Sequence, residues 1–240
     1  MKKAFLFVIT LGMIAPTASA QDDSGVRFGL KLAPNMSWQR PDVKGLSSNG
    51  SKFGYTFGLN IEFPVGANGN YRFATGLLLN NVGGKLKQDY SYSEAGSTVV
   101  LTKELEQDLS LRYVELPLTM KLMTNEIGYI RYFGQIGFGT AFNIRAKADY
   151  DTPVFDPNNG SSVTGFTKLE DEDVKDDIQS FKASLIIGAG MEYNFSGSTS
   201  ILIGVNYNNG FTNTLKDIQV NGKDAKSFQD YLELNLGVFF

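Results

Sequence analysis

Several segments of the chain alternate apolar and polar residues, and charged residues that could do chemistry recur at the polar positions of these segments. In these segments every second residue is apolar, and the residues between are glycine, small polar or charged residues. The charged members of the polar set are Arg27, Lys31, Arg72, Lys121, Arg131, Arg145 and Lys182, with Glu62, Glu115, Glu192 and Glu233. Alternate residues of a strand share a face, so these side chains are predicted to meet in one interior.

Two interpretations of this charged interior compete. It could be a cation-lined path for anions, or a plug of paired charges in a lumen too narrow for bulk water. The plug is favoured because a barrel of eight strands has room inside only for side chains. Phe133, Ile186, Leu202 and Phe239 would add bulk to it.

The composition excludes most catalytic chemistry. The chain has no histidine and no cysteine, so thiol nucleophiles, Cys/His zinc sites and histidine acid–base catalysis are absent. Only Ser/Lys or carboxylate-pair sites would remain, and no spacing indicates one. We therefore predict a protein that is not an enzyme and has no cofactor. The formal charge of −3, with scattered basic residues, predicts no nucleic-acid partner.

An acidic run, 169–177, could bind divalent cations or a basic partner. It lacks the glycine and terminal glutamate spacing of a calcium loop, so a solvated loop is the favoured interpretation.

Eight alternating segments predict the fold. They span 26–36, 52–63, 71–82, 109–122, 129–147, 180–195, 199–207 and 231–240, and several suit a tilted membrane strand. The connections between them alternate long and short, with long ones at 37–51, 83–108, 148–179 and 208–230. This pattern predicts an all-β, eight-stranded, antiparallel up-and-down transmembrane barrel with long extracellular loops and short periplasmic turns.

The apolar face is predicted to meet lipid, because glycine and small polar residues fill a narrow lumen better than a ring of Phe and Leu. A soluble, lipocalin-like barrel would have the opposite arrangement. Aromatic residues sort to the strand ends as two belts: Phe28, Phe63, Tyr71, Phe73, Tyr132, Tyr193, Phe195 and Phe240 near the short turns, and Trp38, Phe53, Tyr55, Phe142, Phe181 and Tyr207 near the long loops.

Three local features give finer expectations. Glu62 and Arg72 flank a short turn and should face each other across the hairpin, while Lys31 and Glu233 lie on the strands that close the barrel. Pro117 lies inside a strand and predicts a bulge there, with a slip of the apolar parity between Tyr113 and Val114.

The two ends of the chain carry export and assembly signals. Residues 1–20 read as a cleaved secretory signal: Lys2 and Lys3 precede an apolar stretch that ends in an A-x-A site, which leaves 21–240 as the barrel domain. Phe240 ends the last lipid-facing strand, and by resemblance to bacterial outer-membrane barrels it is expected to be read by the outer-membrane assembly machinery.

Two stretches carry a family resemblance. Residues 25–35 (GVRFGLKLAPN) and 112–121 (RYVELPLTMK) resemble the PorT-like family of outer-membrane β-barrel proteins of Bacteroidota. The resemblance implies an integral barrel of the cell outer membrane in contact with its lipid. The named member of that family is tied to protein secretion, so a structural or partner-binding function with an envelope protein partner is expected. The alternative is a small porin-like channel.

Overall fold

The computed structural model describes residues 25–66, 69–94, 99–157, 162–197, 199–220 and 222–240. The predicted signal at 1–20 lies outside this part of the chain.

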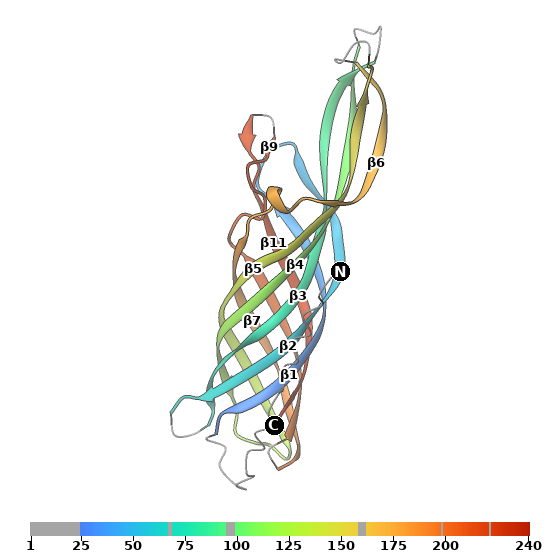
Figure 1. Cartoon of the computed structure of the whole chain (residues 1–240). Coiled ribbons are helices and arrows are strands. Elements are labelled where there is room, and N and C mark those ends of the chain that lie inside the picture. The colour runs from blue at the N-terminus through green and yellow to red at the C-terminus, as the bar shows by residue number, and fades with distance from the viewer. Residues whose placement is uncertain (1–24, 67–68, 95–98, 158–161, 198, 221) are drawn as a thin grey trace, which may run out of the picture.

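Eight long strands form a closed ring in which each strand pairs with its neighbours (Figure 1). They are β1 (Arg27–Pro41), β2 (Leu46–Pro64), β3 (Tyr71–Ser93), β4 (Val100–Met123), β5 (Ile130–Phe155), β7 (Phe181–Ser196), β8 (Thr199–Gly210) and β11 (Ser227–Phe239). All pairs are antiparallel, and β1 closes the ring on β11 with Leu32 opposite Leu236. The predicted all-β, eight-stranded barrel is confirmed.

Four shorter elements lie at the long-loop end. They are β6 (Val163–Asp173), the 3-10 turn η1 (Lys175–Asp177), and the small hairpin of β9 (Gln219–Val220) and β10 (Lys223–Asp224).

The apolar face of the barrel points outward, as predicted. On β2 the side chains of Phe53, Phe57 and Leu59 are exposed while Thr56 and Glu62 are buried, and on β11 Leu232 and Leu234 alternate with buried neighbours. The predicted aromatic residues of both ends lie on this outer face. At the long-loop end Trp38 stacks on Tyr207, and Phe142 contacts Phe181 with ring centroids 5.6 Å apart.

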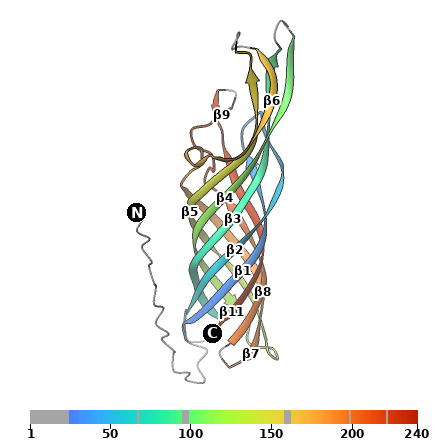
Figure 2. The same ribbon diagram turned by 45° about the vertical axis from the view of Figure 1, so that its right-hand side comes forward.

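The predicted long loops contain more strand than expected. Strands β3, β4 and β5 continue far beyond the barrel, and β5 turns back as β6, so that two hairpins form an extension at one end of the molecule (Figure 2). Phe166 of β6 joins the hairpins: its ring lies 5.1 Å from Tyr92, and the Lys103 ammonium lies 3.9 Å above it. The connection predicted at 37–51 likewise shrinks to 42–45.

The prediction that Arg145 faces the lumen is wrong, because β5 contains one extra residue in its register with β4. Tyr113 pairs with Asn143 while Arg112 pairs with Arg145, so Ile144 has no partner in the register. This bulge reverses the alternation of β5. Arg145, predicted to face the lumen, therefore faces outward with its side chain 51% exposed.

The bulge predicted at Pro117 is wrong. Pro117 pairs directly with Gly139, and the β3–β4 register is the same on both sides of it. The predicted parity slip in β4 is also wrong, because Leu109, Leu111, Tyr113 and Glu115 all stay on the buried face. What changes along this strand is the chemistry of the interior, from polar to apolar.

An apolar cluster explains that change by closing the long-loop end of the barrel. Inward residues of β3, β4 and β5 pack there against residues that follow β6 and β8. Its buried members include Leu86, Leu109, Leu111, Tyr113, Val174, Ile178, Leu215 and Val220. The barrel therefore has an apolar cap at this end.

Candidate functional site

The interior of the barrel is a chain of ion pairs, and its most charged part lies near the short turns. The Lys121 ammonium donates to Glu62 Oε1 at 2.7 Å and also to Glu192. Arg27 donates to the other oxygen of Glu192 at 2.9 Å and lies 3.7 Å from Glu62. Two cations thus share two carboxylates, and all four come from different strands.

Aromatic rings cover these cations. The Lys121 ammonium lies 4.4 Å from the centroid of Phe133 and 5.2 Å from that of Phe239, and the Arg27 guanidinium lies 4.7 Å from Phe239. Phe133 and Phe239 form a buried cluster with Met123 and Leu202. Ring faces stabilise cations most where water is excluded, so the aromatic residues both fill the lumen and hold its charges.

A second group of contacts lies further along the lumen. Lys31 donates to Glu233 Oε1 at 2.5 Å across the seam of β1 and β11, the two strands that were predicted to close the barrel. The same oxygen accepts a 2.7 Å hydrogen bond from Asn206 Nδ2. The side-chain oxygen of Asn206, Oδ1, in turn accepts a hydrogen bond from Gln135. Each carboxylate is thereby tied to more than one strand.

The third group surrounds Glu115. Its carboxylate accepts hydrogen bonds from the Tyr231 hydroxyl and from Asn80 Nδ2, both at 3.0 Å. The Lys182 ammonium lies 3.7 Å away between the rings of Tyr113 and Tyr231. Lys182 Nζ has no hydrogen-bond partner among the described residues.

Between these groups lies a cavity of about 40 Å³, lined by residues that include Lys31, Glu62, Glu115 and Glu233. Among the described residues, the second carboxylate oxygens of Glu62 and Glu233 have no hydrogen-bond partner, although that of Glu62 lies 3.7 Å from Arg27. A polar cavity of this size has room for a few water molecules. In the part of the chain that the structure describes, apolar clusters thus lie at both ends of a lumen that is filled by paired charges.

The remaining predicted lumen residues lie at the edges of this network. Arg72 is buried, but it pairs in register with Pro64, and Glu62 pairs with Ala74, so the expected Glu62–Arg72 facing pair does not form. Arg72 instead donates to the carbonyl of Gly25 at 3.3 Å. Arg131 lies near the short turns, 3.6 Å from Glu126.

Sequence reasoning missed the uncharged half of the network. Asn80, Asn206, Gln135 and Tyr231 supply hydrogen bonds to or beside the carboxylates, as described above. Gln39 and Gln229 are also buried, joined by a 2.6 Å hydrogen bond. All occupy the same alternating positions as the charges, so strand parity was the signal that could have found them.

Other kinds of site are not found in the described part of the chain. No three acidic residues gather there in a way that could hold a metal ion, and the acidic run instead lies mostly in β6, where Asp171 pairs with Lys147. No helix of the described residues is long and apolar enough to cross a membrane.

A ring of tilted strands with an apolar outside, aromatic belts and an interior of paired charges defines a membrane-spanning β-barrel. The family model of the outer membrane protein beta-barrel domain matches residues 19–216, and the chain belongs to that family. Its place is accordingly the outer membrane. No curated protein matches the chain.

Several solved barrels resemble it in structure. Neisserial surface protein A is 15% identical over 90% of this chain and 96% of its own, with a TM-score of 0.46. The attachment invasion locus protein Ail of Yersinia pestis is 15% identical over 90% and 97%, with a TM-score of 0.36. The outer membrane protease OmpT of Escherichia coli is 10% identical over 90% and 96%, with a TM-score of 0.40.

Proposed function

We propose that this protein is a closed, non-enzymatic outer-membrane barrel that presents its β3–β6 extension to a partner protein of the envelope. The observation that carries the proposal is the contrast between the two parts of the molecule. The lumen is packed with ion pairs and capped, whereas the extension continues far beyond the barrel. A packed lumen argues against the alternative of a small porin-like channel.

The far part of the extension has the features of a binding surface. Exposed apolar side chains gather near the tips of both hairpins: Val99, Val100, Val154 and Phe155. The pairing of β4 with β5 ends where Gln107 meets Tyr150. From there towards the hairpin tip, β4 pairs among the described residues with β3 alone. Free strand edges beside apolar side chains are suited to pairing with another chain.

The export and family proposals follow from the sequence. We infer that residues 1–20 are removed on export and that 21–240 form the mature domain. The extension then faces outside the cell, and Phe240, 56% exposed at the end of the closing strand, is the residue read by the assembly machinery. The resemblance to PorT-like proteins of Bacteroidota favours a partner linked to protein secretion.

Cross-linking in intact cells tests the proposed partner surface. Val100 and Ile127 are both 65% exposed, but Ile127 lies in a short turn at the other end of the barrel. Val100→Asp should abolish the cross-linked species that the wild type forms, and Ile127→Asp should leave it unchanged. If no cross-linked species depends on Val100, the extension is not the partner surface.

The proposed orientation needs a separate test. Protease added to intact cells should cut the chain between β3 and β4 or between β5 and β6. Cleavage that occurs only after the outer membrane is breached would place the extension on the periplasmic side.

A further inference from the structure

The lipid-facing surface of β2 to β5 ends abruptly in a basic row. Phe57, Leu79, Val114 and Phe142 stand side by side in register across these four strands, and Phe142 is followed by Phe181 on β7. The next outward-facing row towards the extension lies two residues further along β2, β3 and β4 and three along β5, because of the bulge at Ile144. It reads Tyr55, Asn81, Arg112 and Arg145. The change from apolar to basic residues marks the level at which hydrocarbon gives way to lipid head groups.

Two arginines oppose each other in that row. Arg112 and Arg145 are direct cross-strand partners on the outer face of β4 and β5. Like charges in this position destabilise a sheet. The other residues of the row do not neutralise this repulsion. The Nε–H of Arg112 donates to the uncharged side chain of Asn81 at 2.7 Å, and among the described residues Arg112 makes no ion pair.

The nearby carboxylates are already engaged. Asp171 hydrogen-bonds to Lys147 and only reaches to within 3.9 Å of Arg145 Nη2. That hydrogen bond lowers the pKa of Asp171 below its ordinary value. Asp108 accepts from Lys52 at 2.5 Å. Among the described residues Arg112 therefore has no carboxylate partner, and Arg145 has only the 3.9 Å contact with Asp171, so the arginine pair can still take up an anion.

We propose that Arg112 and Arg145 bind the phosphate group of a phosphorylated glycolipid in the outer leaflet of the outer membrane. A guanidinium group can donate two parallel hydrogen bonds to the oxygens of a phosphate, and it remains charged at every relevant pH. Tyr55, 48% exposed at the other end of the row, presents a hydroxyl at the same level. Phe142 and Phe181, one row below, offer a contact surface for the acyl chains.

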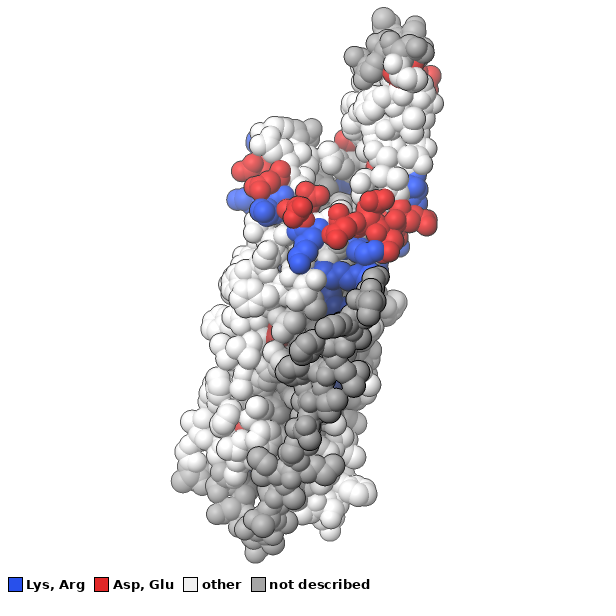
Figure 3. Space-filling view, viewed as in Figure 1, with Lys and Arg blue, Asp and Glu red and all other residues white. Residues whose placement is uncertain are grey.

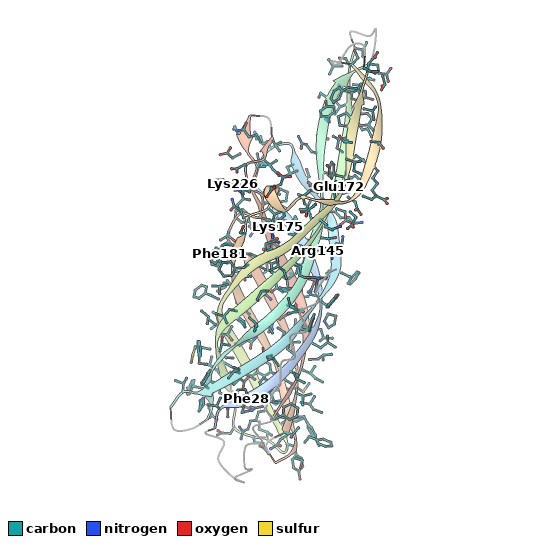
Figure 4. The ribbon with its side chains drawn as sticks, in the orientation of Figure 1. Phe28, Arg145, Glu172, Lys175, Phe181 and Lys226 are labelled. Carbon is teal, nitrogen blue, oxygen red and sulfur yellow. The ribbon has the colours of Figure 1, made fainter. Side chains whose placement is uncertain are left out.

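The wider charge pattern agrees with this assignment. Figure 3 shows Lys and Arg gathered at this end of the barrel, with Asp and Glu beyond them on the side of the extension. Figure 4 shows Arg145 where β5 leaves the barrel for the extension. The positive charges thus lie nearest the membrane and the negative charges further out, which is the order that an anionic head-group layer favours.

The inference rests on the proposed orientation for the source of the lipid, but binding itself can be measured without it. The purified protein is placed in phosphatidylcholine nanodiscs, where both leaflets are accessible, and titrated with lipid A or with dephosphorylated lipid A. We expect wild type to prefer lipid A, and the double variant Arg112→Gln/Arg145→Gln to lose about tenfold or more in affinity.

Two further variants control the measurement. Lys216→Gln/Lys226→Gln removes the same charge from the β8–β11 connection, and Figure 4 shows Lys226 apart from Arg145. This variant should bind as wild type does. Asp171→Asn, which removes the competing carboxylate, should bind lipid A more tightly.

A wild-type measurement keeps the test decisive if the double variant folds poorly. Phenylglyoxal modifies accessible arginines, and mass spectrometry reads each site. Lipid A should protect Arg112 and Arg145, while dephosphorylated lipid A and inorganic phosphate should not. Equal modification in all three conditions, or equal affinities of wild type for the two lipids, would overturn the proposal whatever the orientation test shows.

Discussion

Replacing Lys121 by methionine should destabilise the barrel strongly, because it leaves buried carboxylates short of a counterion. The Lys121 side chain is 1% exposed, and its partners Glu62 and Glu192 are 2% and 3% exposed. Removing one partner of a buried ion pair costs about 3–5 kcal/mol. Arg27 remains within reach of both carboxylates, at 3.7 Å and 2.9 Å, so the loss should fall near the lower limit.

The assay is urea unfolding from lipid vesicles, followed by the fluorescence of the single tryptophan, Trp38. Lys121→Met should unfold at a clearly lower urea concentration than wild type, by about 3 kcal/mol in free energy. The double variant Lys121→Met/Glu192→Gln restores the balance of one cation to one carboxylate and should recover much of the loss. An unchanged midpoint for Lys121→Met would refute the view that paired charges stabilise the lumen.

Three further predictions concern the lipid face, the C-terminus and the extension. Ile187→Arg, on the outer face in the middle of β7, should lose about 2–4 kcal/mol in the same assay, and Ile187→Leu should be nearly neutral; similar values would contradict the assignment of faces. Deleting Phe240 should lower the heat-modifiable, folded fraction in outer-membrane preparations, whereas Phe239→Ala should mainly lower the unfolding free energy, by about 3–5 kcal/mol, because Phe239 is 1% exposed inside the lumen; equal folded yields for wild type and the deletion would be evidence against the assembly signal. The Lys147 hydrogen bond lowers the pKa of Asp171 from 3.8, so this contact stabilises the extension at neutral pH and is lost only as the pH falls through the lowered value; a carboxyl NMR titration with its midpoint at or above 3.8 would refute it.

The barrel itself could be predicted from the sequence because the two faces of each strand lie in different environments. Lipid outside and a narrow interior impose alternation, so the strands, their order and the outward face of residues such as Phe57 and Leu59 followed from the pattern. The charged residues Lys31, Lys121 and Glu233 were placed in the lumen for the same reason. Which of these charged side chains contact one another depends on the stagger of the strands around the ring, and the alternation of residues does not predict that stagger.

The extension could not be predicted because its strands leave the membrane. In the stretches 83–108 and 148–179 neither face meets lipid, so alternation weakens and the strands resemble polar loops. Arg145 was misplaced because the single unpaired residue Ile144 reverses the parity of β5 without a glycine or proline to signal it. Leu109 and Leu111 continue the inward alternation of β4, and apolar side chains suit the interior there because loops fold back over the barrel mouth, a tertiary contact that no local pattern reveals.

The central claim, that the lumen is filled and closed, is tested most directly by conductance in planar bilayers. The protein with its ion pairs between Lys121, Glu62, Glu192, Lys31 and Glu233, and its apolar cap, should show no stable open current at any modest voltage. A stable, large single-channel current in the purified wild-type protein would contradict the account and favour the porin-like alternative.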